Sequence, residues 1–138
     1  MLFAMTCLAL QAAEADNITG GRELYLDFCA TCHGVNLEGA PDWQTPGPDG
    51  QLPAPPHDET GHTWHHGDAF LFGYVKMGGQ AVLDDLGVRY DSGMPPFDGV
   101  LGDAEIEAIL AYIKSTWPPR VREYQAARTA QEHAERTR

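Results

Sequence analysis

The pentapeptide Cys29-Ala30-Thr31-Cys32-His33 constrains this chain more than any other stretch of its sequence. Two thiols three positions apart, followed at once by an imidazole, form the pattern that attaches haem to a polypeptide. The thiols can form thioether bonds to the two vinyl groups of one porphyrin, and the neighbouring imidazole nitrogen can bind the iron axially. The motif therefore predicts one covalently attached haem c, with Cys29 and Cys32 as the attachment points and His33 as an axial ligand.

Two other kinds of site also use a Cys-x-x-Cys pair. A thioredoxin-like redox pair requires a βαβ setting, and no strand-like apolar run precedes Cys29. A zinc site requires further ligands, and because the sequence has no second Cys-x-x-Cys, distant histidines would have to complete it. Both alternatives stay open, although the adjoining His33 favours haem.

The charge of the chain limits its partners. Nine Lys and Arg residues stand against 20 Asp and Glu, which gives a formal net charge of −11. Such an acidic surface disfavours nucleic acid and anionic membranes as partners. A chain of 138 residues is expected to form one domain, and its 15 glycines and 10 prolines predict much loop.

Residues 1–15 are typical of a secretion signal. An apolar stretch leads to Ala13-Glu14-Ala15, which fits a cleavage site, although no basic residue precedes Arg22 and a start codon assigned too late would explain this. The apolar stretch is too short to span a membrane. Cys7 is interpreted as an ordinary signal-peptide residue, so no structural disulfide is expected. We therefore expect a periplasmic protein, with membrane contact only through a partner or an uncleaved leader.

Two segments with helical periodicity are expected to enclose the motif. Residues 18–30 lead directly into it, and the pair Gly20-Gly21 predicts close approach of another backbone. The strongest helix begins near Gly102 and stops at Pro118-Pro119. Its apolar residues follow the i, i+3, i+4, i+7, i+11 series: Ile106, Ile109, Leu110, Ile113 and Trp117.

From Gly34 to about His66 there is no sustained periodicity, and six prolines exclude a regular helix. A structureless connection of this length is expected to have a function in a compact domain. We expect it to wrap the haem on the His33 side. A carbonyl within residues 52–56 is expected to accept a hydrogen bond from the His33 ring and orient it.

The last ten residues of this loop contain four histidines: His57, His62, His65 and His66. Their imidazoles could bind a second metal such as copper or zinc, or supply an alternative haem ligand. They are otherwise ordinary loop residues that bond haem propionates, backbone and water. Few cysteines or carboxylates at ligand spacing accompany them, and imidazoles alone do not select a metal.

Met94 is the expected second axial ligand. A short helix is predicted from Asp68 to Lys76, with Met77 in the core or at the helix end, and a breaker-rich loop follows over residues 80–92. Met94 then lies in Gly93-Met94-Pro95-Pro96-Phe97, where prolines fix the backbone and can hold the thioether in one direction. A Met thioether opposite His raises the potential of haem iron. The alternative is a gap-filling core residue.

Together these parts resemble a class I, single-haem cytochrome c of bacterial periplasmic type, over roughly residues 18–117. The matching segments are Gly21-x-x-Leu24-Tyr25-x-x-x-Cys29-Ala-x-Cys32-His33-Gly34, Met94-Pro95-Pro96-Phe97 and Ile109-Leu110-Ala111-Tyr112-Ile113. The resemblance implies a small all-α fold in which three to four helices and long loops pack around one covalently bound haem. It also implies that the first and last helices cross where Gly21 and Tyr25 meet Ile109 and Tyr112. Residues expected to pack in the haem pocket are Tyr25, Pro55, Trp64, Pro95, Phe97 and Tyr112.

The resulting functional prediction is an electron carrier rather than an enzyme, cycling single electrons with redox proteins that present a basic docking face. One alternative is a haem enzyme or sensor with a labile sixth ligand. Another is a metal-binding module that uses the cluster His57–His66. Residues 16–119 are expected to form the domain. Residues 120–138, which are rich in Arg, are expected to be a solvated, partly helical or disordered tail, with a docking arm for an acidic partner as the alternative.

Overall fold

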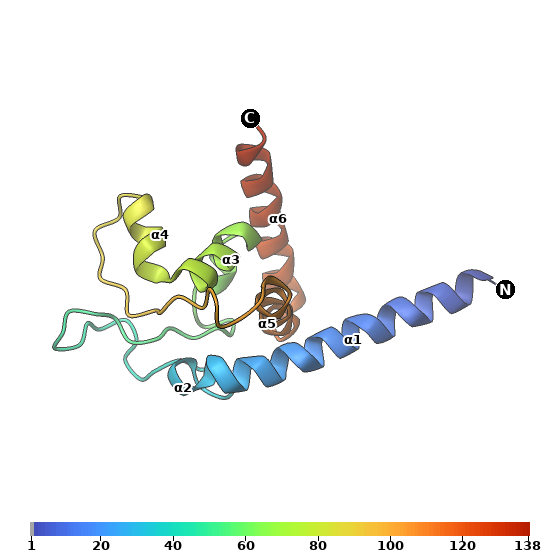
Figure 1. The fold of residues 1–138 in the computed structure, drawn as a ribbon, viewed down its shortest axis with the longest axis horizontal. Helices are drawn as coiled ribbons and strands as arrows, with labels where there is room; N and C mark the ends of the chain where they lie inside the picture. The colour runs from blue at the N-terminus through green and yellow to red at the C-terminus, as the bar shows by residue number, and fades with distance from the viewer. Residues whose placement is uncertain (1) are drawn as a thin grey trace.

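The computed structural model describes residues 2–138, with side chains described from residue 11 onward. All regular structure in this range is helical, which confirms the expected all-α class (Figure 1). The six helices exceed the three to four that the sequence predicts. The elements are α1 (Leu2–Phe28), α2 (Ala30–His33), the 3-10 turn η1 (Thr63–His65), α3 (Asp68–Met77), α4 (Gly79–Asp85), α5 (Asp103–Ser115) and α6 (Pro119–Arg136).

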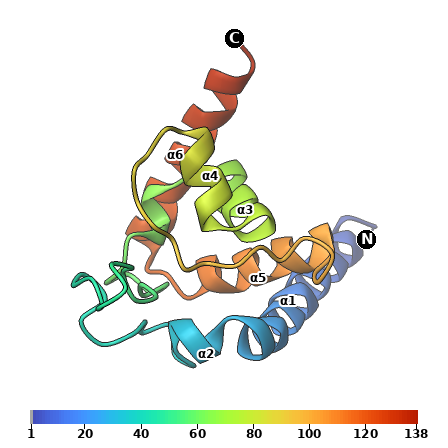
Figure 2. The same cartoon turned by 60° about the vertical axis from the view of Figure 1, so that its left-hand side comes forward.

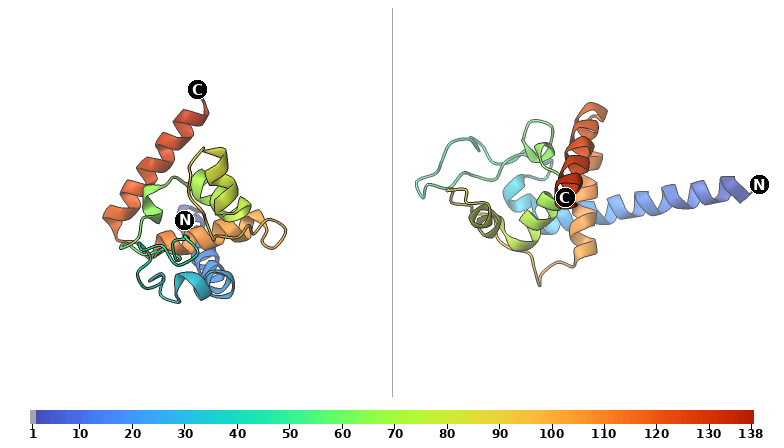
Figure 3. Two further views of the ribbon diagram at one scale, coloured as in Figure 1. Left: turned by 90° about the vertical axis from the view of Figure 1, so that its left-hand side faces the viewer. Right: turned by 90° about the horizontal axis from the view of Figure 1, so that it is seen from above.

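Helix α1 begins well before the predicted residues 18–30 and includes most of the segment interpreted as a secretion signal. Its N-terminal part projects away from the other helices (Figures 1 and 3), and residues 11–17 are all exposed. Cys7 lies outside the residues whose side chains are described. Among residues 2–138, no helix combines the length and apolar character needed to cross a membrane.

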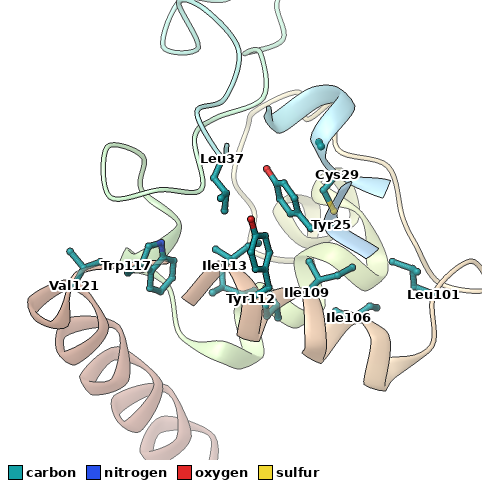
Figure 4. Packing of buried hydrophobic residues seen from close by; sticks show 13 residues of the cluster. Tyr25, Cys29, Leu37, Leu101, Ile106, Ile109, Tyr112, Ile113, Trp117 and Val121 are labelled. Carbon is teal, nitrogen blue, oxygen red and sulfur yellow. The ribbon is translucent and has the colours of Figure 1, made fainter. Parts of the chain in front are cut away.

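The contact between α1 and α5 forms the centre of the core. A Cβ atom on Gly21 would overlap the carbonyl group of Ala108, so the two backbones approach as closely as the predicted glycine notch requires. Tyr25 and Ile109 are almost completely buried at this crossing (Figure 4). The ring centroids of Tyr25 and Tyr112 lie 5.5 Å apart. The expected contact of these helices is therefore confirmed.

A short helix, α4 (Gly79–Asp85), occupies part of the segment predicted as a loop, and this prediction was wrong for residues 80–85. Its sequence, Gly-Gln-Ala-Val-Leu-Asp-Asp, contains several good helix formers, and Gln80 Nε2 donates to Asp84 Oδ1 one turn later (2.8 Å). α4 follows α3 at Gly78, whose φ of 83° lies in the left-handed region. The remainder, from residue 88 to Met94, is the irregular segment that leads to the predicted ligand (Figure 2).

The Arg-rich tail forms the 18-residue helix α6, which docks on the body rather than lying free in solvent. Val121 and Gln125 are buried, with 2% and 4% of their surfaces exposed. Gln125 Nε2 donates to Asp68 Oδ1 (2.7 Å), and the carboxylate of Glu132 accepts two backbone hydrogen bonds from the start of α3. Polar bonds thus hold this helix where its apolar residues are few.

Candidate haem site

The cysteine motif lies at the junction of α1 and α2, where the chain stays helical through His33. Cys29 N donates to Tyr25 O and His33 N donates to Cys29 O, each at 2.9 Å. The Tyr25 hydroxyl then donates to Gly34 O (2.9 Å), which fixes the end of this turn. Because this backbone is helical, the two thiols are displayed about one turn apart on a fixed frame.

The two thiols differ in their surroundings. Both Cys29 and Cys32 are free, but Cys29 is buried while Cys32 is exposed. Burial, and then the neighbouring Cys32 thiol, raises the pKa of Cys29 to about 11. Cys29 is therefore a protonated thiol at neutral pH, presented beside the apolar core rather than to solvent (Figure 4).

The His33 ring is buried and is oriented by the backbone of the proline-rich loop. Its Nδ1 donates to the carbonyl oxygen of Pro55 at 2.8 Å, which confirms the predicted carbonyl within residues 52–56. Burial lowers the pKa of His33 below its usual value, and the bond to Pro55 opposes that effect. Nδ1 is committed to this bond, so Nε2 of a neutral imidazole is the atom available to a metal.

A second imidazole lies flat against the first. The ring centroids of His57 and His33 are 4.0 Å apart and the rings are inclined by 23°, which is a stacked arrangement. Burial, followed by the nearby imidazoles of His33 and His62, lowers the pKa of His57 well below its usual value. His57 is therefore neutral around pH 7 and belongs to the His33 site rather than to a separate histidine cluster.

The segment that carries Met94 is attached to α3 and α4 by backbone hydrogen bonds. Gly79 N donates to Met94 O (3.0 Å), and Phe97 N donates to Val75 O (3.2 Å). The rings of Phe28, at the end of α1, and Phe97 meet edge to face with centroids 6.4 Å apart. This contact brings the Met94 segment to the end of α1, and His33 and Met94 lie near each other.

The six residues expected to pack around the haem lie in different surroundings. Tyr25 and Tyr112 are in the core beneath the motif, Pro55 holds His33, and Phe97 contacts the end of α1. Pro95 is exposed. Trp64 lies on η1, where its ring meets Tyr124 of α6 with centroids 5.2 Å apart.

Each of the other loop histidines has an aromatic partner of its own, and the rings of His62 and His66 also meet edge to face, with centroids 5.9 Å apart. His62 stacks on Trp43, His65 lies against Trp64, and His66 stacks on Phe70 with centroids 4.3 Å apart. Within residues 2–138, no group of three or more His, Cys, Asp or Glu side chains is arranged to hold a metal ion. The second metal site considered from the sequence thus has no preformed ligand cluster in the part of the chain that is described.

The contact of His57 with His33 is not predicted by the sequence pattern. The spacing groups His57 with the other loop histidines, whereas the structure places its ring on His33. One signal was available, because His57 directly follows residues 52–56, the segment expected to hold His33. The face-to-face contact itself depends on the return of a 22-residue loop and has no local pattern.

A family model described as cytochrome c matches residues 18–117. No curated protein and no solved structure matches the chain.

Proposed function

This chain belongs to the cytochrome c family, whose cofactor is a covalently attached haem c, and from that premise we propose that it is a single-electron carrier with His33 and Met94 as axial iron ligands. The family generally carries electrons rather than transforming substrates. The observation that carries the proposal is the 2.8 Å bond from His33 Nδ1 to Pro55 O, because it leaves Nε2 for the iron.

The donor groups fit haem c by their chemistry. Cys29 and Cys32, both free, are the two thiols that thioether attachment requires. His33 supplies a buried, neutral imidazole nitrogen, and Met94 supplies a thioether from a segment fixed by Pro95 and Pro96. The aromatic and aliphatic residues around Tyr25 and Ile109 supply an apolar wall.

When bound, haem c supplies a one-electron couple between ferric and ferrous iron. The residues of this chain then determine how that couple behaves. Met94, as a soft and weak donor, favours the ferrous state and so raises the potential. The Pro55 carbonyl orients the His33 ring and raises the basicity of its other nitrogen by accepting a hydrogen bond from Nδ1–H. With His33 and Met94 both bound to it, the iron would have no position open for a substrate.

The charge distribution supports a redox partner with a basic docking face. Five of the nine Lys and Arg residues lie at or beyond Arg120, so the body that carries the motif holds most of the acidic excess. Helix α6 extends away from α2 in two views (Figures 1 and 2). A cationic partner is therefore attracted to the body, through a small and transient contact outside the cytoplasm.

Salt dependence tests this partner class. The rate of electron transfer from a cationic donor protein is expected to fall at least about threefold between low and 0.3 M ionic strength, because screening removes the attraction. An anionic donor of similar potential is the control, and its rate is expected to rise. A rate that does not depend on salt with the cationic donor would contradict the proposed charge steering.

Visible spectra of the haem-loaded protein in both redox states test the ligand set. We expect a low-spin spectrum with a weak sulfur-to-iron band in the red region of the ferric form. That band is expected to disappear in Met94→Ala and to persist in Met77→Ala, since Met77 is half exposed at the end of α3. A high-spin spectrum, or rapid binding of carbon monoxide by the untreated ferrous protein, would instead indicate a haem enzyme or sensor with an open sixth position.

A further inference from the structure

His57 contacts the predicted iron ligand on a side that the Pro55 hydrogen bond does not restrain. The bond from His33 Nδ1 to Pro55 O fixes one atom of the ring, at 2.8 Å. One hydrogen bond alone lets the ring rock until its N–H turns away from the Pro55 oxygen. The flat contact with His57, at a centroid distance of 4.0 Å, opposes this rocking motion directly.

His57 is itself held firmly enough to act as a support. Its Nδ1 and the hydroxyl oxygen of buried Thr63 share a hydrogen bond of 2.8 Å. The ring also meets Tyr25 edge to face, with centroids 6.3 Å apart. Its backbone nitrogen donates to Leu37 O (2.8 Å), and its backbone oxygen accepts from Trp117 Nε1 (2.7 Å).

The two restraints on His33 come from one short stretch of chain. Pro55 supplies the carbonyl, His57 supplies the stacked ring, and Pro56 joins them with a fixed φ. Pro56 is buried, and its carbonyl packs so closely on Gly61 that a Cβ there would overlap it. The Pro55 carbonyl and the His57 ring therefore keep a constant position relative to each other, and both contact the His33 ring.

We propose that His57 is a positioning residue that fixes the plane of the His33 imidazole about its bond to the iron. The inference rests on the proposed function, since it takes His33 as the axial ligand. Unlike an aliphatic side chain, a planar ring presents a flat surface to His33. The hydrogen bond to Thr63 prevents the His57 ring from rotating. The fixed plane of the His57 ring then sets the plane of the stacked His33 ring.

Proton exchange at His33 provides a readout that does not depend on electron transfer. In the ferrous, haem-loaded protein, the exchange rate of the His33 Nδ1 proton with solvent is measured by NMR for wild type, His57→Leu and His57→Phe. We expect His57→Leu to increase the rate by about two- to tenfold, the range that corresponds to the loss of one aromatic pair. His57→Phe retains a planar ring and is expected to restore most of the protection. The backbone amide of Ile109, in the core, serves as the internal reference for global opening.

A spectroscopic readout reports the ring plane itself. The g values of the ferric low-spin signal depend on the orientation of the axial ligands, so they are expected to shift or broaden in His57→Leu and to stay near the wild-type values in His57→Phe. His62→Leu is the matched control, because His62 stacks on Trp43 rather than on His33. It is expected to change neither readout.

Three results would overturn the inference. The first is an exchange rate and g values of His57→Leu that match wild type, and the second is an equal effect of His62→Leu. If His57→Leu does not incorporate haem, Thr63→Val replaces it, since this variant keeps the ring but removes its hydrogen-bonding partner. The third is a Thr63→Val protein whose exchange rate and g values both match those of wild type. A wild-type protein without a low-spin histidine-ligated spectrum would instead refute the proposed function, so the two failures are distinguishable.

Discussion

Glu132 of α6 closes the N-terminus of α3, a helix that has no side-chain cap of its own. The residue before α3 is Gly67, and no side chain caps the helix from that position. The Glu132 oxygens take its place from a distant part of the chain, accepting from Ala69 N (2.9 Å) and Phe70 N (2.8 Å). A Cβ at Gly67 would overlap the Glu132 carboxylate, so the glycine leaves room for this contact.

The expected cost of removing this carboxylate follows from those two bonds. Loss of a helix cap costs about 1 kcal/mol, and a negative charge at a helix N-terminus adds about 0.3–1 kcal/mol. Glu132→Ala is therefore expected to lower the free energy of unfolding by about 2 kcal/mol, and Glu132→Gln, which keeps one acceptor oxygen, by about 1 kcal/mol. For a chain of this size, 2 kcal/mol corresponds to a fall in Tm of roughly 6–10 °C.

Guanidinium chloride unfolding of the ferric haem-loaded protein, followed by far-ultraviolet circular dichroism, measures these free energies. The control is Glu135→Ala, which removes an exposed glutamate of the same helix that bonds only Gln131 within α6 (3.0 Å). We expect a change below about 0.5 kcal/mol for that variant. If Glu132→Ala is as stable as wild type, or Glu135→Ala is equally destabilised, then α6 does not stabilise α3 in the way described.

Two further perturbations test the core and the loop histidines. Gly21→Ala is expected to destabilise the fold by about 1–3 kcal/mol in urea unfolding, because its methyl group would overlap Ala108, whereas Gly20→Ala faces open space and should be neutral or stabilising. Equal effects of the two changes would contradict the close helix crossing. Burial, and then the neighbouring charged groups, lowers the pKa of His66 to about 4 from 6.5, so the unfolded chain takes up the proton first as pH falls through that interval. Wild type is therefore expected to lose about 1–2 kcal/mol between pH 7 and pH 4 relative to His66→Phe, a loss reduced by solvent because the ring is partly exposed. Parallel stability curves of the two proteins would refute this.

The parts of the fold that the sequence predicts are those controlled by local pattern. The cysteine motif at the end of a helix, the apolar series of α5 and the glycine notch at Gly21 each follow from spacing and residue size. The carbonyl that holds His33 lies within the predicted residues 52–56, in the proline-rich loop that was expected to wrap the His33 side.

The remainder depends on tertiary partners that have no local signature. Helix α6 has few apolar residues, and Gln125 and Glu132 stabilise it only once Asp68 and the start of α3 are in place. Helix α4 is too short for its propensity to outweigh the surrounding glycines in a sequence-based prediction. The stacking of His57 on His33 arises from loop closure, which the spacing of the histidines does not encode.

The backbone bond between Gly79 and Met94 has a consequence for how the protein responds to stress. His33 is attached to the fully packed crossing of α1 and α5, whereas the methionine segment is attached mainly through single backbone bonds beside exposed residues such as Met77 and Leu86. Regions with few buried contacts open at lower free energy than the global unit. Heating or mild denaturant is therefore expected to release the Met94 thioether while the His33 imidazole remains in place. The Met94 side of the site thus opens at a lower free energy than the His33 side.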